Sequence, residues 1–276
     1  MSIQSVHRAI DILYLFSSQR LSLGVTEIGQ LLGLSKTTVH GLVKSLAERG
    51  FLNQDPETRK YFLGLNIYDL NSTLSDTLKI NQVGTPAAQR LAQDLRMLVR
   101  IAIWDQGTIL ITRCIFPDVP DFLVSQLGPR VPAYCSGIGK AVLAALPEEA
   151  LRSYFDTVVL NRFTPHTIVA KKALKQEIIS SRSRGYALDC EEFLPGVICI
   201  AAPIRDHSNQ PIGGISISGG PEYSNRDDME AHIVKLKQTA GEISRYMGHF
   251  PEMSSTNRAF WETAVSPSKN YPGKKR

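Results

Sequence analysis

The chain has 276 residues, of which 43% are hydrophobic, and it carries a formal net charge of +5. A chain of this length buries a substantial core, and the usual size of domains predicts two unequal ones. It has no apolar run of the roughly 18 residues that a membrane helix needs, and no basic-then-apolar leader, so we expect a cytoplasmic protein. The cysteines form no C-x-x-C pair and have no histidine at metal-ligand spacing, which disfavours a zinc site and a disulfide scaffold. They are Cys114, Cys135, Cys190 and Cys199.

The positive charge is concentrated at the two ends of the chain. Residues 1–65 hold seven Lys and Arg against five Asp and Glu, residues 66–251 hold nineteen of each, and residues 252–276 hold five against two. This distribution is typical of a protein whose terminal segments meet polyanions. Basic tails are often only solvated, so charge alone leaves the function open.

The first elements predicted are two helices and an extended segment. A helix over 4–17 would bury one stripe, made of Val6, Ile10, Leu13 and Phe16. Residues 21–25 read as an extended connection. Thr26 is then placed to cap a brief helix.

A tight turn is predicted at Gly33-Leu34-Ser35, where the glycine can adopt a left-handed conformation and Ser35 can cap the next helix. That helix, about 36–49, ends at Gly50. Its two faces differ. The apolar face carries Val39, Leu42, Val43 and Leu46, and the other face carries Lys36, Thr37, His40, Gly41 and Lys44.

A short helix, a tight turn and a second helix with a polar, cationic face are what entry into the major groove of DNA requires. Residues 51–63 read as a strand, a turn-rich loop and a strand, and this hairpin would carry Arg59 and Lys60 near its tip as a wing that reaches phosphates. We therefore predict a winged helix-turn-helix over residues 1–65. The alternative is a small helical bundle whose hairpin docks on a protein. The predicted DNA-binding residues are Thr26, Ser35, Lys36, Thr37, Thr38, His40, Gly41, Lys44, Arg59 and Lys60.

A linker helix is predicted over 66–83, with an apolar stripe at Ile67, Leu70, Leu74 and Leu78. This stripe would pair with its counterpart in a second subunit, because winged helices usually read paired half-sites. Packing on its own domain is the alternative.

A larger domain is predicted over 84–249, beginning with a helix that Thr85 caps and Pro86 opens. Residues 99–104 alternate as a strand does, and a turn at 105–107 leads to a strand at 108–114. Clustered hairpins with flanking helices predict an α+β fold with an antiparallel sheet. Further strands are expected at 197–205 and 212–218, and helices at 137–146, 148–155, 171–183 and 227–247. Residues 250–276 read as a basic, disordered tail.

The sequence resembles the IclR family of bacterial transcriptional regulators in several runs. They are 26–40, the opening 5–9, the wing end 61–64, and the stretches 128–141, 185–192, 196–206 and 215–219. The chain departs from the family at Gly41, where arginine is usual, at Leu95-Arg96-Met97-Leu98, where a polar turn is common, and at Tyr134, where histidine is usual. The resemblance implies a GAF-like domain that binds a small effector through the residues at Ser136, Gly137, Asp189, Cys199, Ser216 and Ser218.

Chemistry supports part of this set. Ser136-Gly137 begins a helix, so free backbone amides there can hold a carboxylate without a cationic side chain. Ser216 and Ser218 share one face of a strand where apolar residues are expected. Asp189 would repel a carboxylate, so we expect it to accept a hydrogen bond from a ligand hydroxyl or from a neighbour. The alternative is that Asp189 caps a turn, Cys199 fills the core and the serines bind backbone.

Nucleotide chemistry is disfavoured. Gly137-Ile138-Gly139-Lys140 lacks the P-loop pattern, because Tyr134 stands where its first glycine is needed and Ala141 where its hydroxyl is needed. Gly213-Gly214 and Gly219-Gly220 bracket a strand and so do not form a dinucleotide motif.

Two other functions are weaker alternatives. A cysteine hydrolase would use Cys199 as nucleophile, but this thiol lies in an apolar run where thiols are usually inert; its base would be His166, His207 or His232. A membrane or protein adaptor would use Phe260 and Trp261 of the tail. We expect no catalytic residue, cofactor or metal.

The prediction is a homodimer, or a dimer of dimers, that binds double-stranded operator DNA of a catabolic operon. A small organic acid or aromatic effector would control that affinity. We expect a repressor, with an activator of the same type as the alternative.

Overall fold

The computed structural model describes residues 2–17, 19–117, 130–220 and 226–250. The chain divides into two compact units, and the boundary between them falls between Leu78 and Lys79. Within the described residues, no helix is both long and apolar enough to cross a membrane. Each unit is described by itself below.

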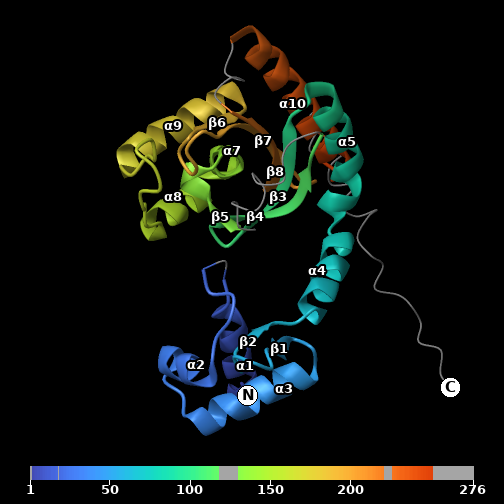
Figure 1. Ribbon diagram of the computed structural model, residues 1–276. Helices are drawn as coiled ribbons and strands as arrows, with labels where there is room; N and C mark the ends of the chain where they lie inside the picture. The colour runs from blue at the N-terminus through green and yellow to red at the C-terminus, as the bar shows by residue number, and fades with distance from the viewer. Residues whose placement is uncertain (1, 18, 118–129, 221–225, 251–276) are drawn as a thin grey trace, which may run out of the picture. The chain divides into compact units, whose positions relative to one another are not determined.

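The first unit is a helix-turn-helix followed by a β-hairpin (Figure 1). Its elements are α1 (Gln4–Tyr14), α2 (Val25–Leu32), α3 (Lys36–Glu48), β1 (Leu52–Gln54), β2 (Tyr61–Leu63) and α4 (Asn66–Thr77). The first three helices and the hairpin share one core of buried side chains. These are Ile12, Phe16, Leu23, Ile28, Val39, Val43, Leu52 and Tyr61.

The turn between α2 and α3 has the predicted form. Gly33 takes a left-handed conformation with φ +65°, and Leu34 N donates to Gly29 O at 2.9 Å. Ser35 caps α3, since its hydroxyl accepts from Thr38 N at 3.2 Å. Both features confirm the sequence prediction, and they place α3 at a sharp angle to the helix before it.

The predicted cap at Thr26 is wrong. The first helical residue of α2 is Val25, and Gly24 N donates to the Glu27 carboxylate at 2.6 Å. The carboxylate at the third helical position thus accepts from the backbone N–H of the residue just before the helix, as in a capping box. Thr26 lies exposed in the first turn.

The predicted apolar stripe of the first helix is buried only in part. Phe16 is 9% exposed, but Val6 and Ile10 are 52% and 45% exposed, and Ile12 is the residue that α1 buries completely. The helix also ends at Tyr14 rather than at residue 17. The stripe at Val6 and Ile10 is therefore left uncovered in the single chain.

The hairpin is antiparallel, with Leu52 opposite Leu63. Its turn is held by Asp55, whose carboxylate accepts from the backbone of Glu57 and Thr58 at 2.9 and 2.7 Å. Leu23 pairs with Tyr61 through two backbone hydrogen bonds of 2.9 and 2.8 Å, so the predicted extended segment lies beside β2.

The first helix of the second unit, α5 (Lys79–Leu95), begins seven residues before Pro86, its predicted first residue. Residues 79–83, predicted to be linker, form its first turns. The hydroxyl of Thr85 donates to Asn81 O at 2.6 Å instead of capping, and Pro86 lies inside the helix. The earlier turns are retained because they are packed, since Ile80 is only 3% exposed. Asn81 also accepts from the Thr112 hydroxyl at 2.6 Å.

The second unit is built on a six-stranded antiparallel sheet in the order β5-β4-β3-β8-β7-β6. The strands are β3 (Leu98–Asp105), β4 (Thr108–Ile115), β5 (Arg130–Pro132), β6 (Ala187–Cys190), β7 (Ile198–Arg205) and β8 (Pro211–Gly219). The antiparallel α+β fold predicted from the sequence is confirmed. β5 and β6 were not predicted, because three or four residues are too few to show a period of two.

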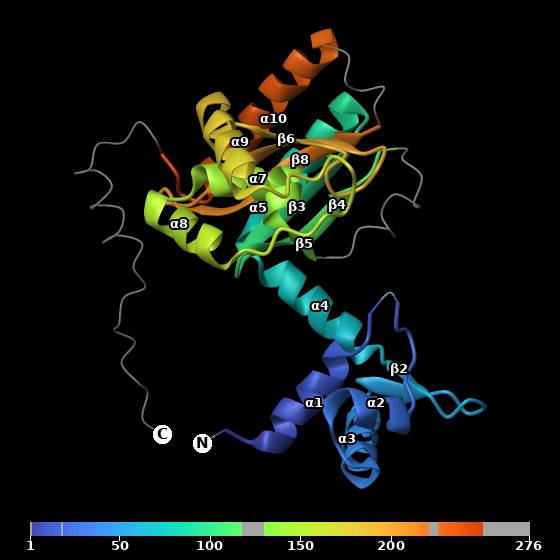
Figure 2. The same cartoon turned by 90° about the vertical axis from the view of Figure 1, so that its left-hand side faces the viewer.

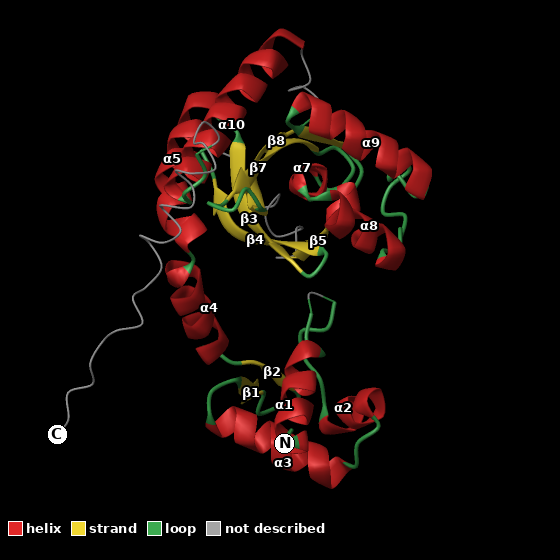
Figure 3. Ribbon diagram, turned by 180° about the vertical axis from the view of Figure 1, so that it is seen from behind, coloured by secondary structure: helices red, strands yellow, loops and turns green. Residues whose placement is uncertain are grey.

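Helices cover both faces of the sheet (Figures 2 and 3). One face carries α5 and α10 (Arg226–Tyr246), which lie side by side. The other face curls around α7 (Gly137–Ala145), with α8 (Glu148–Thr157) and α9 (Lys171–Arg184) outside it. The short 3-10 turn η1 (Ala133–Cys135) leads into α7. The main core of the unit lies between α7 and the sheet.

Replacing Ser35 with alanine should lower the free energy of unfolding of the first unit by about 1 kcal/mol, because the first turn of α3 loses its cap. Urea titration followed by circular dichroism measures the loss. Ser45→Ala is the matched control, since the Ser45 hydroxyl only donates to Gly41 O within α3 at 3.0 Å and should cost close to nothing. Equal effects of the two variants would contradict the capping role.

Candidate functional site

The exposed face of α3 is polar and cationic, as the spacing predicts. Val39 and Val43 are completely buried, which turns the opposite side of the helix to solvent. The exposed residues are Ser35, Lys36, Thr37, His40, Gly41 and Lys44, whereas Thr38 is half-buried. The hydroxyls of Ser35 and Thr38 lie 2.9 Å apart and take part in the helix cap.

Two of the predicted phosphate ligands already have carboxylate partners. Lys60 lies 3.3 Å from Glu27, so the hairpin is linked to α2 at this point. The pKa of Glu27 is lowered, first by the hydrogen bond from Gly24 N and then by Lys60. Lys44 lies 3.9 Å from Glu48 in an exposed pair of the weak kind. Arg59 is exposed in the turn of the hairpin and takes a left-handed φ of +59°.

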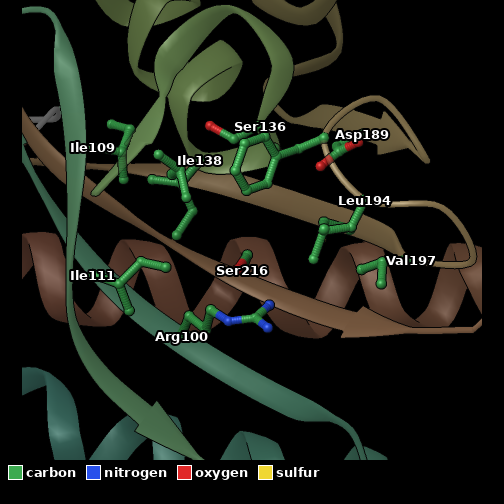
Figure 4. A pocket seen from close by; sticks show the side chains of 13 residues that line it. Arg100, Ile109, Ile111, Ser136, Ile138, Asp189, Leu194, Val197 and Ser216 are labelled. Atoms are coloured by element: carbon green, nitrogen blue, oxygen red, sulfur yellow. The ribbon is translucent and has the colours of Figure 1, made fainter. Parts of the chain in front are cut away.

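A pocket lies between the start of α7 and the concave face of the sheet (Figure 4). Five of the six predicted effector residues line it: Ser136, Gly137, Asp189, Cys199 and Ser216. The other lining residues are Arg100, Ile109, Ile111, Val131, Ile138, Phe193, Leu194 and Val197.

Strand register explains why residues far apart in sequence meet here. Asp189 pairs with Cys199, which pairs with Ser218. One row along, Ser216 pairs with Arg100 on the other side of β8. Because positions two residues apart on a strand share a face, both rows face α7.

Ser218, the sixth predicted residue, does not line the pocket. Its hydroxyl donates to Cys199 Sγ at 3.1 Å and accepts from Arg100 Nη1 at 2.7 Å. Both partners line the pocket, and together they use the hydroxyl as donor and as acceptor. Ser218 therefore contacts two of the residues that line the pocket.

The first turn of α7 is held close to the sheet. A Cβ on Gly137 would lie only 3.2 Å from Cys199 Cβ and 3.3 Å from Ala201 Cβ, so a larger residue would push the helix away. The Ser136 hydroxyl donates to Pro132 O at 2.9 Å and accepts from Gly139 N at 3.3 Å. This serine caps the helix by accepting from the Gly139 amide, which leaves the Gly137 and Ile138 amides as the ones that an anion could approach.

Asp189 is buried with 5% of its surface exposed and accepts from Glu192 N at 2.8 Å. It thus caps a turn, which is the alternative that the sequence left open. Burial raises the pKa of its carboxyl to about 7. Beside it, Lys140 and Glu192 form a buried ion pair that joins α7 to the segment after β6.

Cys199 is a poor nucleophile. Burial, followed by the charge of Asp189, raises the pKa of its thiol to about 12, so the thiol stays protonated at neutral pH. The hydrolase alternative needs a thiolate and a base. Of its candidate bases, His166 and His207 are exposed and His232 lies on α10, across the sheet from the pocket.

Sequence reasoning missed Arg100. Its side chain is 5% exposed, lines the pocket, and has no hydrogen-bond acceptor for Nε in the described structure. A cationic side chain is therefore present in the pocket, in addition to the backbone amides that the sequence suggested for an anion. The signal was an arginine in an otherwise apolar strand, between Val99 and Ile101. The alternating pattern placed Arg100 on the other face of the strand from Val99 and Ile101, but it did not show that this second face is also buried.

Replacing Asp189 with asparagine should make the protein less sensitive to rising pH. The pKa of about 7 in the folded state exceeds the usual 3.8, so the folded state holds a proton that the unfolded state has released between these values. The free energy of unfolding of the native protein therefore falls as pH rises from about 4 to 7. Lys140 and Glu192 are unchanged in the variant.

Melting temperatures at pH 5 and pH 8 measure this effect. The quantity compared is the melting temperature of Asp189→Asn minus that of the native protein. This difference should be higher at pH 8 than at pH 5 by roughly 3–6 °C. Asp156→Asn, on the exposed side of α8, is the control and should show the same difference at both pH values. A pH-independent effect of Asp189→Asn would contradict the raised pKa.

The chain matches two family models. The C-terminal model of the bacterial transcriptional regulator IclR matches residues 72–245, and the IclR helix-turn-helix model matches residues 5–56. Together they include α3 and every residue that lines the pocket.

Individual proteins agree with these matches. The chain is 31% identical to the HTH-type transcriptional regulator XynR of Escherichia coli, over 90% of this chain and 98% of that protein. It is 29% identical to the acetate operon repressor of Salmonella typhimurium, over 79% of this chain and 80% of that protein. The crystal structure of the Thermotoga maritima IclR aligns with a TM-score of 0.71 at 28% identity, covering 90% of this chain and all of that one. The chain therefore belongs to the IclR family of DNA-binding transcriptional regulators.

Proposed function

We propose that this regulator represses a catabolic operon, and that a small organic acid or aromatic effector in the pocket beside α7 changes its affinity for operator DNA. The observation that carries the proposal is the exposed, polar and cationic face of α3, presented by the turn at Gly33. The name of the Salmonella relative supports repression. An activator of the same architecture would use the same two sites.

The DNA contacts are assigned by exposure and charge. Lys36 and Thr37 stand at the start of α3, where the helix N-terminus also favours phosphate. His40 and Lys44 follow on the same face. Gly41, at the position where arginine is usual in the family, offers no side chain, so base readout at that point depends on the close approach of the helix backbone.

The hairpin contributes less than its charge suggests. Lys60 already neutralises Glu27, so a phosphate gains little from it, whereas exposed Arg59 remains available. We therefore assign the wing contact to Arg59.

A second copy of the chain is the proposed partner of α4. This helix buries none of its residues, and Leu70 and Leu74, one turn apart on the same face, are 58% and 56% exposed. Such a stripe costs free energy in water unless it is covered. The same need arises at Val6 and Ile10 of α1. A dimer would cover these surfaces and present two copies of α3 to paired half-sites.

Effector control requires a difference in affinity between two arrangements of the protein. A ligand that binds the DNA-competent and DNA-incompetent arrangements equally shifts nothing. The pocket supports such a difference because a ligand in it would contact two elements at once, α7 and the sheet.

Replacing Lys36 with alanine should weaken operator binding and reduce the slope of log affinity against log salt by about 0.9, the value for one lost phosphate contact. Gel-shift titrations over a series of salt concentrations, with a duplex selected from a random library, measure both quantities. Lys172→Ala, on the exposed side of α9, is the control and should leave both unchanged. Unchanged binding by Lys36→Ala would contradict the assignment of α3.

Replacing both Leu70 and Leu74 with aspartate should convert a dimer to monomers and weaken operator binding at least tenfold, because two charges are placed in the proposed interface. Analytical ultracentrifugation gives the mass. Ser72→Asp, on the opposite side of α4, is the control and should keep the native mass. A native protein that sediments as a monomer would contradict the assignment of α4.

A further inference from the structure

We infer that Arg100 is the anchor for a carboxylate in the sensor pocket, and that the effector is a monocarboxylate with an apolar body. This inference rests on the proposed function and names the chemistry of the same pocket. It places the acid group of the ligand at the sheet, whereas the first turn of α7 was the position expected from the sequence. Figure 4 shows the Arg100 side chain entering the pocket region from β3, below Ser216.

The charge of Arg100 is not balanced within the described structure. A guanidinium keeps its positive charge in proteins. Its recorded side-chain partners are the Ser218 hydroxyl at 2.7 Å and the Cys114 thiol. Burial raises the pKa of Cys114, so that thiol is neutral. Neither partner supplies a negative charge, and among the described residues no carboxylate forms an ion pair with Arg100.

Asp189, the acidic residue that lines the pocket, does not serve as the missing anion. It lies on β6, and β7 and β8 separate that strand from β3. Three strand spacings amount to about 14 Å along the sheet. The charged groups that act on Asp189 are Glu192 and Lys140. Figure 4 accordingly shows Asp189 and Arg100 on opposite sides of the pocket.

An unbalanced buried charge costs several kcal/mol, and an anion that enters the pocket removes this cost. A carboxylate suits a guanidinium because its two oxygens match the paired N–H donors of that group. The ligand thereby gains a charge-assisted hydrogen bond inside a site with mostly apolar walls. A neutral ligand of the same shape gains no such interaction.

The rest of the pocket defines the body of the ligand. Its walls are mostly apolar: Ile109, Ile111, Val131, Ile138, Phe193, Leu194 and Val197. A second carboxylate would have to face these side chains or Asp189. The lining therefore favours a single acid group on a hydrocarbon or aromatic body. The raised pKa of Asp189 allows its protonated form to donate to a polar atom at the far end of such a ligand.

Calorimetric titration of the full chain tests the inference with matched pairs: benzoate, phenylacetate, butanoate and hexanoate, each against its primary amide. Each pair differs in charge and hardly in shape. At least one acid should bind tenfold or more tightly than its amide. A panel in which no acid binds more tightly than its own amide overturns the anchoring role, and this comparison needs only the native protein.

Variants locate the interaction. Arg100→Met should bring the affinity for the preferred acid down to that for its amide, and Arg100→Lys should restore part of the difference. Arg130→Met is the matched control, because Arg130 is exposed and pairs with Asp105 away from the pocket. It should keep the native preference. Arg100→Met that folds and still prefers the acid overturns the inference.

Gel shifts on the same preparations separate this inference from the proposed function. Operator binding without any preference for acids leaves a regulator whose effector is not a carboxylate. Failure to bind any selected duplex contradicts the regulatory proposal itself, whatever the calorimetry shows.

Discussion

The close approach of the first turn of α7 to the sheet is the constraint on which the sensor unit depends. Gly137 permits contact with β7, and Gly139 permits contact with the turn before the helix, where a Cβ would lie 2.3 Å from Ala133 Cα. Gly139 leaves no room for a side chain, and a side chain at Gly137 would force its neighbours to shift by a few tenths of an ångström. Because the helix is held there, its free amides, Asp189 and Arg100 all face one small volume. Backbone packing thus forms the pocket, and the same packing fixes the positions of its polar groups.

The buried charges of the second unit are of two kinds, paired and unpaired. Lys140 and Glu192 balance each other in a buried pair that fixes the segment leading to the pocket. Arg100 is buried without such balance. A charge pair of the first kind contributes to a unique structure, while an unbalanced charge has a cost that is justified by binding. Tyr134 shows that a departure from the family pattern need not mark function: its hydroxyl donates to Asn161 O and accepts from Asn161 N, both at 2.8 Å.

Much of the fold could be predicted from the sequence, because periodicity and turn chemistry are local. The glycine turn before α3, the cap at Ser35 and the long strands all follow from a few adjacent residues. The misplaced start of α5 had another cause, since burial of Ile80 overrode a strong local start signal at Thr85 and Pro86. Competition between local signals and packing cannot be resolved from one sequence.

The two candidate sites likewise contain features that local sequence predicts and features that depend on the three-dimensional structure. The exposed face of α3 was predictable because a helix has one repeating geometry. In the pocket, the resemblance to the family supplied Ser136, Gly137, Asp189, Cys199 and Ser216, all of which line it. It could not show that Ser218 is turned toward Arg100, since this depends on the register between β3 and β8. Arg100 itself was hidden, because its importance lies in a missing counter-charge, and that is a property of three-dimensional surroundings.

The hydrogen bond between Thr112 and Asn81 fastens the beginning of α5 to β4. That strand also supplies Ile109 and Ile111 to the pocket wall. The wall of the pocket and the first turns of α5 are therefore joined through one strand, so a shift of that strand would act directly on the start of this helix.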